Sequence, residues 1–189
     1  MREQLLEPIL RQMRIGGVLP ILRDYRDCEL LDVGCGWDAR LLRSCEPFIK
    51  RGIGIDFKAP AIKSDRISTI ATRLDEKLPF PDQRFDVVTM LAVLEHLDNP
   101  MAILAEISRV LRPGGRLLLT VPSWYAKPVL EFLAFRIGIV NADEIRDHKR
   151  YYSRAELFSL FVDIRGLTIE SHVYFQGVFN NRLVARKDA

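Results

Sequence analysis

Leu30-Leu-Asp-Val-Gly-Cys-Gly-Trp-Asp-Ala39 is the stretch of this sequence that decides the fold. Its first half is apolar enough for a short buried strand, and residues 38–49 continue it with a helical pattern. Between them, Gly34 and Gly36 permit a tight turn and let a ligand approach the backbone. The stretch therefore predicts a strand, a ligand-binding turn and a helix that Asp38 can cap.

Strand and helix patterns alternate outward from this turn. Further short strands are expected at 51–56, 67–71, 85–90 and 116–121, with a helix at 99–112 that ends in Pro113-Gly-Gly. Such alternation predicts a parallel sheet with right-handed crossovers and helices on both faces. The end of the chain differs: Ser153-Arg-Ala-Glu156 has the pattern of a capping box, and the β-rich runs 167–175 and 178–186 predict an antiparallel hairpin. The fold class is therefore α/β, with a seven-stranded, mostly parallel sheet.

The composition suits one folded domain. The 189 residues are 48% hydrophobic and 28% charged, with a formal net charge of +3, which excludes a disordered chain. We expect a single domain over residues 1–189, with an N-terminal helical segment at 1–28 and an insertion at 123–152 that forms an acceptor site or lid. The charge is weak and scattered, so nucleic-acid binding is not favoured.

The cysteines and the chain start bear on location. Cys28, Cys35 and Cys45 form neither a disulfide framework nor a CxxC metal pair, so reduced thiols and no metal are expected. Residues 1–15 are charged throughout, unlike a signal peptide, and no stretch approaches the roughly 20 uninterrupted apolar residues of a membrane span. We therefore expect a cytoplasmic protein.

Three carboxylates surround the glycine turn. Asp56 ends the next strand, 22 positions after Gly34, a spacing at which a carboxylate accepts hydrogen bonds from a ribose diol. Gly34-x-Gly36-x-x-Ala39 also matches the dinucleotide fingerprint, which leaves an NAD(P)-dependent oxidoreductase open. Asp32 and Asp38, however, disfavour a pyrophosphate and suit a ligand with an ammonium and a sulfonium. Charge therefore favours S-adenosylmethionine over NAD as the ligand. The third possibility is a glycine turn that binds no ligand, with its acidic residues in solvent.

The motifs LLDVGCG, LPFPDQRFDVV, LEHLDNP and LRPGG, with Asp56, resemble those of the class I S-adenosylmethionine-dependent methyltransferases. The sequence is most similar to the small-molecule branch called type 11, which is similar to quinone-biosynthesis methyltransferases. The resemblance implies a Rossmann-like fold, S-adenosyl-L-methionine as cofactor and S-adenosyl-L-homocysteine as product. The sequence departs from the family's pattern at Asp38, where relatives usually carry Gly, and at Arg73-Leu74, where relatives commonly carry an Asp near the adenine.

The resemblance also implies a role for each matching position. The expected cofactor contacts run from the methionine end through the ribose to the adenine. They are Asp32, Gly34, Cys35, Gly36 and Asp38 around the turn, Asp56 on the ribose, Phe57, Leu74 and Asp75 beside the adenine, and Leu91 and Ala92 closing the methionine end.

Candidate groups for proton transfer and for acceptor binding lie later in the chain. A base is needed only if the acceptor must lose a proton, and His96 and His148 are the candidates, whereas His172 is expected to be structural. The aromatic, apolar run 123–140 is a core helix, a lid or wall for an apolar or lipid-linked acceptor, or a surface that touches a membrane or another subunit. We expect a small-molecule or lipid- or sugar-linked acceptor, with peripheral membrane contact and a homo-oligomer open. A non-catalytic partner subunit that keeps the fold is the remaining alternative.

Overall fold

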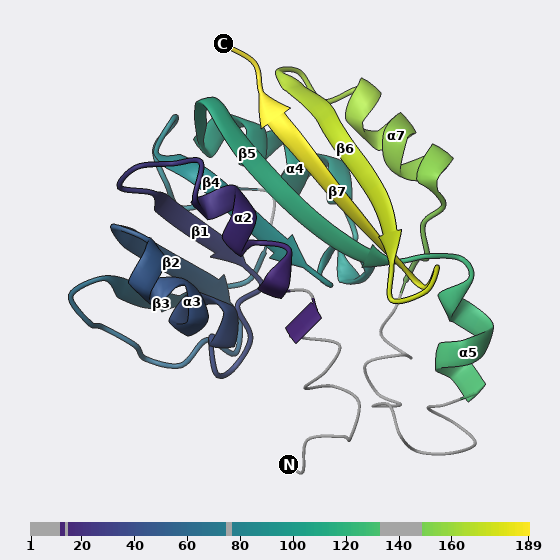
Figure 1. The fold of residues 1–189 in the computed structure, drawn as a ribbon, viewed down its shortest axis with the longest axis horizontal. Coiled ribbons are helices and arrows are strands. Elements are labelled where there is room, and N and C mark those ends of the chain that lie inside the picture. The colour runs from purple at the N-terminus through teal and green to yellow at the C-terminus, as the bar shows by residue number, and fades with distance from the viewer. Residues whose placement is uncertain (1–11, 14, 75–76, 133–148) are drawn as a thin grey trace.

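The computed structural model describes residues 12–13, 15–74, 77–132 and 149–189 (Figure 1). In this part of the chain seven strands form one sheet with the order β3-β2-β1-β4-β5-β7-β6. Their bounds are β1 Glu29–Val33, β2 Arg51–Asp56, β3 Ile67–Ala71, β4 Phe85–Leu91, β5 Leu111–Pro122, β6 Leu167–Phe175 and β7 Asn180–Lys187. The first five strands pair in parallel, and β7 is antiparallel to both β5 and β6. The predicted sheet with its antiparallel C-terminal hairpin is confirmed.

Helices cover both faces of this sheet. The described helices are α2 Leu19–Leu22, α3 Arg40–Cys45, α4 Pro100–Val110, α5 Ala126–Phe132 and α7 Arg154–Val162, with 3-10 turns η1 Glu46–Phe48 and η2 Leu94–His96. Leu30 of β1 belongs to a buried cluster with residues of α2 and α3, whereas its neighbour Leu31 belongs to one with residues of α4 and α7. Because successive strand residues point to opposite faces, β1 is apolar on both sides.

The helix after the glycine turn is shorter than predicted. It begins at Arg40 rather than 38 and gives way to η1 at Glu46, where Pro47 follows. Ala39 occupies the position before the helix with a left-handed φ of 47°, so Asp38 lies one residue too early to cap it. The Asp38 carboxylate pairs with Arg40 instead, and the predicted cap is wrong.

Other boundaries differ from the prediction. Helix α4 ends at Val110, and Leu111 already pairs with Phe85 in the sheet. Strand β5 therefore begins at Leu111 rather than 116 and contains Pro113-Gly-Gly; Arg112, directly before the proline, avoids the helical region. Strand β7 begins at Asn180, since Gln176 and Gly177 adopt positive φ in the turn. Of the helical segment predicted at 1–28, residues 1–11 and 14 lie outside the described residues, and α2 lies within that segment.

The predicted capping box is confirmed. The Ser153 hydroxyl accepts the Glu156 backbone N–H at 3.2 Å, and the Glu156 carboxylate accepts the Ser153 backbone N–H at 2.7 Å. This pair begins α7, which packs against β6 (Figure 1).

Candidate functional site

The two glycines of the turn after β1 serve different purposes. Both have positive φ, 78° at Gly34 and 70° at Gly36. A Cβ on Gly34 would lie 2.2 Å from the Val93 side chain, whereas a Cβ on Gly36 would meet nothing within 4 Å. Gly34 is therefore needed for packing between two loops of the sheet edge. Gly36 leaves its backbone open to a ligand.

The carboxylate after β2 closes onto this turn. The Gly36 backbone N–H donates to Asp56 Oδ2 at 3.1 Å, and the Lys58 N–H donates to Oδ1 at 2.7 Å. The Ile55 carbonyl accepts the N–H groups of Gly34 and Cys35 at 2.8 and 3.1 Å. The ends of β1 and β2 thus form one continuous rim at the carboxyl edge of the sheet, which is where open α/β sheets bind ligands.

Asp32 is a buried carboxyl directly before the turn. Its side chain lies on β1, 3% exposed, and Oδ1 accepts the Thr89 hydroxyl of β4 at 2.8 Å. Burial raises the pKa of the Asp32 carboxyl to about 7, an effect that the Thr89 hydrogen bond opposes and the nearby Asp56 charge adds to. Thr89 is a partner that the sequence analysis missed, although a lone hydroxyl in an apolar strand was a signal for it.

The other predicted cofactor contacts fall into buried and exposed groups. Cys35 is buried, and burial raises its thiol pKa to about 12, so the thiol stays protonated. Phe57 is 64% exposed, with the Lys58 ammonium 4.8 Å from its ring centre. Leu74 packs on the core. Asp75 lies outside the described residues.

The end of β4 supplies the other side of the rim. Leu91 and Ala92 are half-buried, and the Ala92 N–H donates to the Thr120 carbonyl of β5 at 3.0 Å. Ala92 has a φ of 57°, which turns the chain sharply into η2. The candidate base His96 ends η2 and is half-buried.

Segment 149–152 lies beside η2. The Lys149 N–H donates to the Glu95 carbonyl at 2.9 Å, and the Lys149 ammonium lies 2.5 Å from the Asp98 carboxylate. Lys149 follows His148, so the chain next to the second candidate base is held beside the first, although His148 itself is outside the described residues. Glu95, with only 1% of its surface exposed, is an acidic residue at this edge that the sequence analysis missed.

Residues further along this segment pack into the domain. The Tyr152 N–H donates to the Pro122 carbonyl at 3.2 Å, and the Tyr152 carbonyl accepts the Asn181 amide at 2.9 Å. His172 lies 2.9 Å from the Asn181 side-chain oxygen, which agrees with its expected structural role.

Among the described residues no group of three His, Cys, Asp or Glu side chains could hold a metal ion.

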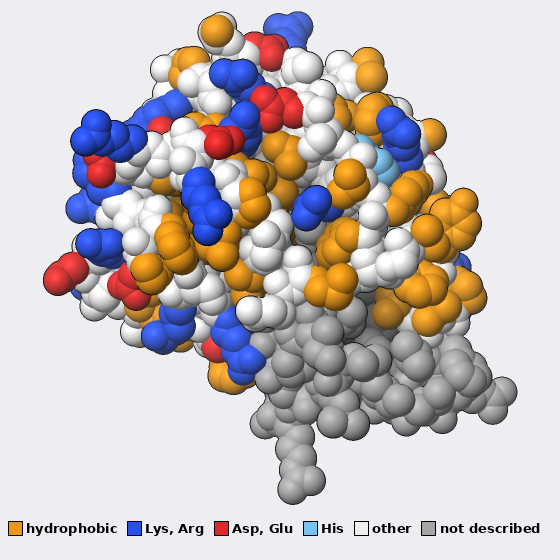
Figure 2. All heavy atoms as spheres, viewed as in Figure 1, with side chains coloured by type: hydrophobic (Ala, Val, Ile, Leu, Met, Phe, Trp, Pro, Cys, Tyr) orange, Lys and Arg blue, Asp and Glu red, His pale blue; other side chains and the backbone are white. Residues whose placement is uncertain are grey.

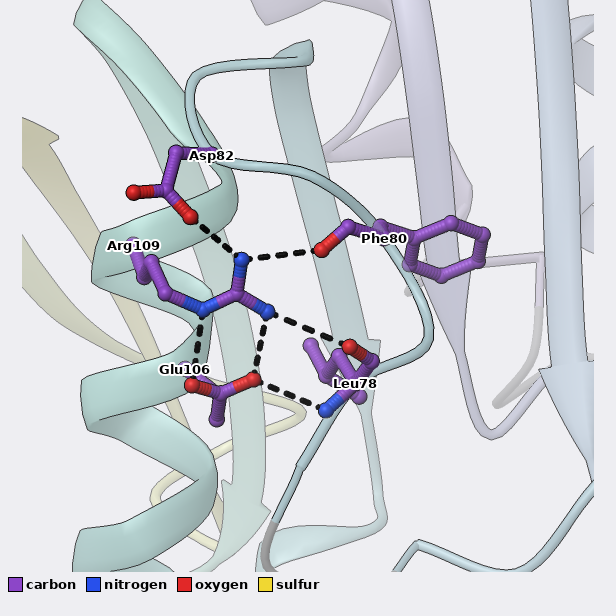
Figure 3. Close-up of polar contacts among 5 residues, drawn as sticks. All are labelled: Leu78, Phe80, Asp82, Glu106 and Arg109. Carbon is purple, nitrogen blue, oxygen red and sulfur yellow. Dashed lines mark hydrogen bonds and ion pairs between the residues drawn. The ribbon is translucent and has the colours of Figure 1, made fainter.

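The loop at 77–84, directly before β4, is held by Arg109 of α4 (Figure 3). The guanidinium donates to the carbonyls of Leu78 at 3.1 Å and Phe80 at 2.8 Å and to the Asp82 carboxylate at 2.7 Å. It also forms a two-pronged pair with Glu106, at 2.8 and 2.6 Å. The hydrogen bond to Glu106 raises the pKa of Arg109 and lowers that of Glu106, so both groups stay charged.

The chain is similar to known methyltransferases. Residues 31–119 match the family model described as a methyltransferase domain. The chain is 32% identical over 158 residues to the 27-O-demethylrifamycin SV methyltransferase of Amycolatopsis mediterranei, covering 72% of this chain and 56% of that protein. It is 30% identical over 142 residues to the ubiquinone/menaquinone biosynthesis C-methyltransferase UbiE of Laribacter hongkongensis, covering 70% and 57%. The chain thus spans little more than half the length of these relatives.

A solved structure shares the fold. The candidate methyltransferase in complex with the Trm112 methyltransferase activator of Haloferax volcanii superposes with a TM-score of 0.72 at 17% identity, covering 100% of both chains. At this identity the likeness shows the fold alone.

Proposed function

Because this chain belongs to the class I S-adenosylmethionine-dependent methyltransferases, we propose that it transfers a methyl group from S-adenosylmethionine to a small acceptor at the carboxyl edge of its sheet. The observation that carries the proposal is the hydrogen bond from Gly36 to Asp56, which joins the glycine turn and the carboxylate into one rim with open space beside Gly36. A ribose diol placed on Asp56 would put the rest of the cofactor along the turn.

Charge supports this cofactor over a dinucleotide. Asp32 and Asp56 are close enough for the Asp56 charge to raise the Asp32 pKa. An ammonium between them is attracted by both carboxylates, whereas a pyrophosphate is repelled. The cofactor, when bound, supplies an activated methyl group on its sulfonium, so the protein's task is to orient the acceptor and exclude water.

The residues of η2 and of segment 149–152 form the acceptor side in this proposal. His96 is the candidate that accepts the acceptor's proton, because it lies directly beyond β4 at the sheet edge. One relative is named for demethylrifamycin and another for ubiquinone and menaquinone biosynthesis. By analogy with them we propose a small, largely apolar acceptor, free or lipid- or sugar-linked.

Methyl transfer is tested by incubating the protein with labelled S-adenosylmethionine and a panel of hydroquinone, phenol and prenylated acceptors. We expect label in at least one acceptor and an equal amount of S-adenosylhomocysteine. With that acceptor, His96→Gln should lower kcat while the cofactor KM stays the same. Tight cofactor binding with no product from any acceptor would favour a non-catalytic partner subunit instead.

A further inference from the structure

Exposed apolar side chains gather where the β6–β7 hairpin closes and α5 begins. Figure 2 shows hydrophobic side chains on this side of the molecule, next to the residues drawn in grey. We call this set the aromatic patch; its members, each between 36% and 60% exposed, are Trp124, Tyr125, Val129, Tyr174, Val178 and Phe179. Four of its six members are aromatic.

Two hydrogen bonds and one contact between rings make the aromatic patch continuous. The Ser123 N–H and hydroxyl donate to the carbonyls of Phe179 and Val178, at 2.9 and 2.6 Å, which joins the hairpin tip to the start of α5. The rings of Tyr125 and Tyr174 lie edge to face with their centres 6.3 Å apart. Val129 lies in α5, which begins directly after Tyr125, at Ala126. Segments about 50 residues apart therefore present one surface.

Among the residues that the structure describes, exposed basic side chains lie near the aromatic patch. These exposed residues are Lys127 on α5, Arg150 and Arg154. The Arg154 guanidinium lies 5.0 Å from the centre of the Phe158 ring. The Phe158 ring contacts the His172 ring, which in turn contacts the ring of Tyr174 in the patch. The acidic neighbour Glu156 accepts hydrogen bonds from Ser153 and, at 2.8 Å, from the Trp124 indole N–H. Its charge is therefore already engaged.

We propose that the aromatic patch docks this protein onto an anionic lipid bilayer. Tryptophan and tyrosine favour the headgroup level of a bilayer, where an apolar ring and a polar tip are both satisfied. Nearby lysine and arginine add attraction to anionic headgroups. A second copy of the chain fits less well, because a twofold contact would bring Lys127, Arg150 and Arg154 of both copies together.

The surface also has a consequence for the proposed methyl transfer. The aromatic patch follows the carboxyl end of β5, where Thr120 pairs with Leu91 at the rim of the candidate site. A bilayer held there would lie near the acceptor side, which suits a lipid-linked acceptor. This consequence rests on the proposed function, whereas the docking itself does not.

The test is sedimentation of the whole chain with vesicles of phosphatidylcholine and phosphatidylglycerol, with pure phosphatidylcholine as the comparison. We expect binding to the mixed vesicles that weakens at high salt. Phe179→Ser and Trp124→Ser should each weaken it by about tenfold, because each removes one inserted ring. The matched control is Phe48→Ser, which removes an exposed phenylalanine of η1 outside the patch and should bind like the wild type.

Three results would contradict docking of the aromatic patch onto a bilayer. Absence of wild-type binding, or equal binding by Phe179→Ser, would show that the patch does not insert. A wild-type dimer that Phe179→Ser converts to a monomer in sedimentation velocity would show that a second copy covers the patch. S-adenosylhomocysteine affinity, measured on the same variants, should be unchanged, so failure of docking is distinguishable from failure of the cofactor site.

Discussion

Replacing Asp32 by Asn should stabilise the protein and weaken its cofactor binding at once. The carboxyl is buried beneath the turn, and burial raises its pKa from 3.8 to about 7. A shift of about 3 pKa units corresponds to about 4 kcal/mol, since each unit is about 1.4 kcal/mol. This free energy is the cost of holding a buried charge that the bound cofactor's ammonium would offset.

The direction with pH follows from proton uptake. Between pH 3.8 and about 7 the folded state keeps the Asp32 proton that the unfolded state has released, so the contribution of this group to stability falls as pH rises through that range. In Asp32→Asn no carboxyl titrates at this position, and the amide can still form a hydrogen bond with the Thr89 hydroxyl. The difference in unfolding free energy between the variant and the wild type should therefore grow with pH, by about 2 to 3 kcal/mol between pH 5 and pH 8.

Urea unfolding of both proteins across this pH range measures the difference. Thr89→Val is the second variant to measure, because without the hydroxyl the pKa of Asp32 should rise further. The decrease in unfolding free energy with pH should then extend to higher pH in Thr89→Val than in the wild type. A difference between Asp32→Asn and wild type that stays constant with pH would refute the assignment of a buried, titrating carboxyl.

Two further predictions concern the turn and the loop before β4. Gly34→Ala should destabilise the fold by about 2 kcal/mol or more, because its Cβ would clash with Val93, and Val93→Ala should restore part of the loss in a double-mutant cycle. Gly36→Ala should cost only about 1 to 2 kcal/mol of stability but should weaken S-adenosylhomocysteine binding more strongly than Gly34→Ala does, as measured by calorimetry. The opposite ranking of the two variants in stability and binding would contradict the open space beside Gly36. Arg109→Met should lower the free energy of urea unfolding by about 3 kcal/mol, since it removes the ion pair with Glu106 and leaves two loop carbonyls without their donor. An unchanged value would refute the role of Arg109 in holding this loop.

The fold was predictable because its signals are local and mutually consistent. Apolar strands such as 85–91 alternate with helices such as Pro100–Val110, and this order leaves few topologies for a parallel sheet. The capping box at Ser153 depends only on neighbouring residues, so it was also visible in the sequence. These features needed no knowledge of distant contacts.

The details of the candidate site were less predictable because they depend on tertiary contacts. The left-handed conformation of Ala39 displaced the expected Asp38 cap, and nothing in the local sequence requires it. The hydrogen bond between Thr89 and Asp32 joins residues 57 positions apart. The position of Glu95 beside Lys149 likewise arises only when segment 149–152 returns to η2. The roles assigned to the cofactor-contact residues stay predictions.

Calorimetric titration with S-adenosylhomocysteine and with NAD, on the wild type and on Asp56→Ala, tests the central claim most directly. We expect one molecule of S-adenosylhomocysteine to bind, NAD not to bind, and Asp56→Ala to weaken binding about a hundredfold, because two hydrogen bonds from the ribose to a carboxylate are lost. Circular dichroism should show that the variant remains folded. Binding of NAD without S-adenosylhomocysteine, or unchanged affinity in Asp56→Ala, would contradict a methyltransferase site on this rim.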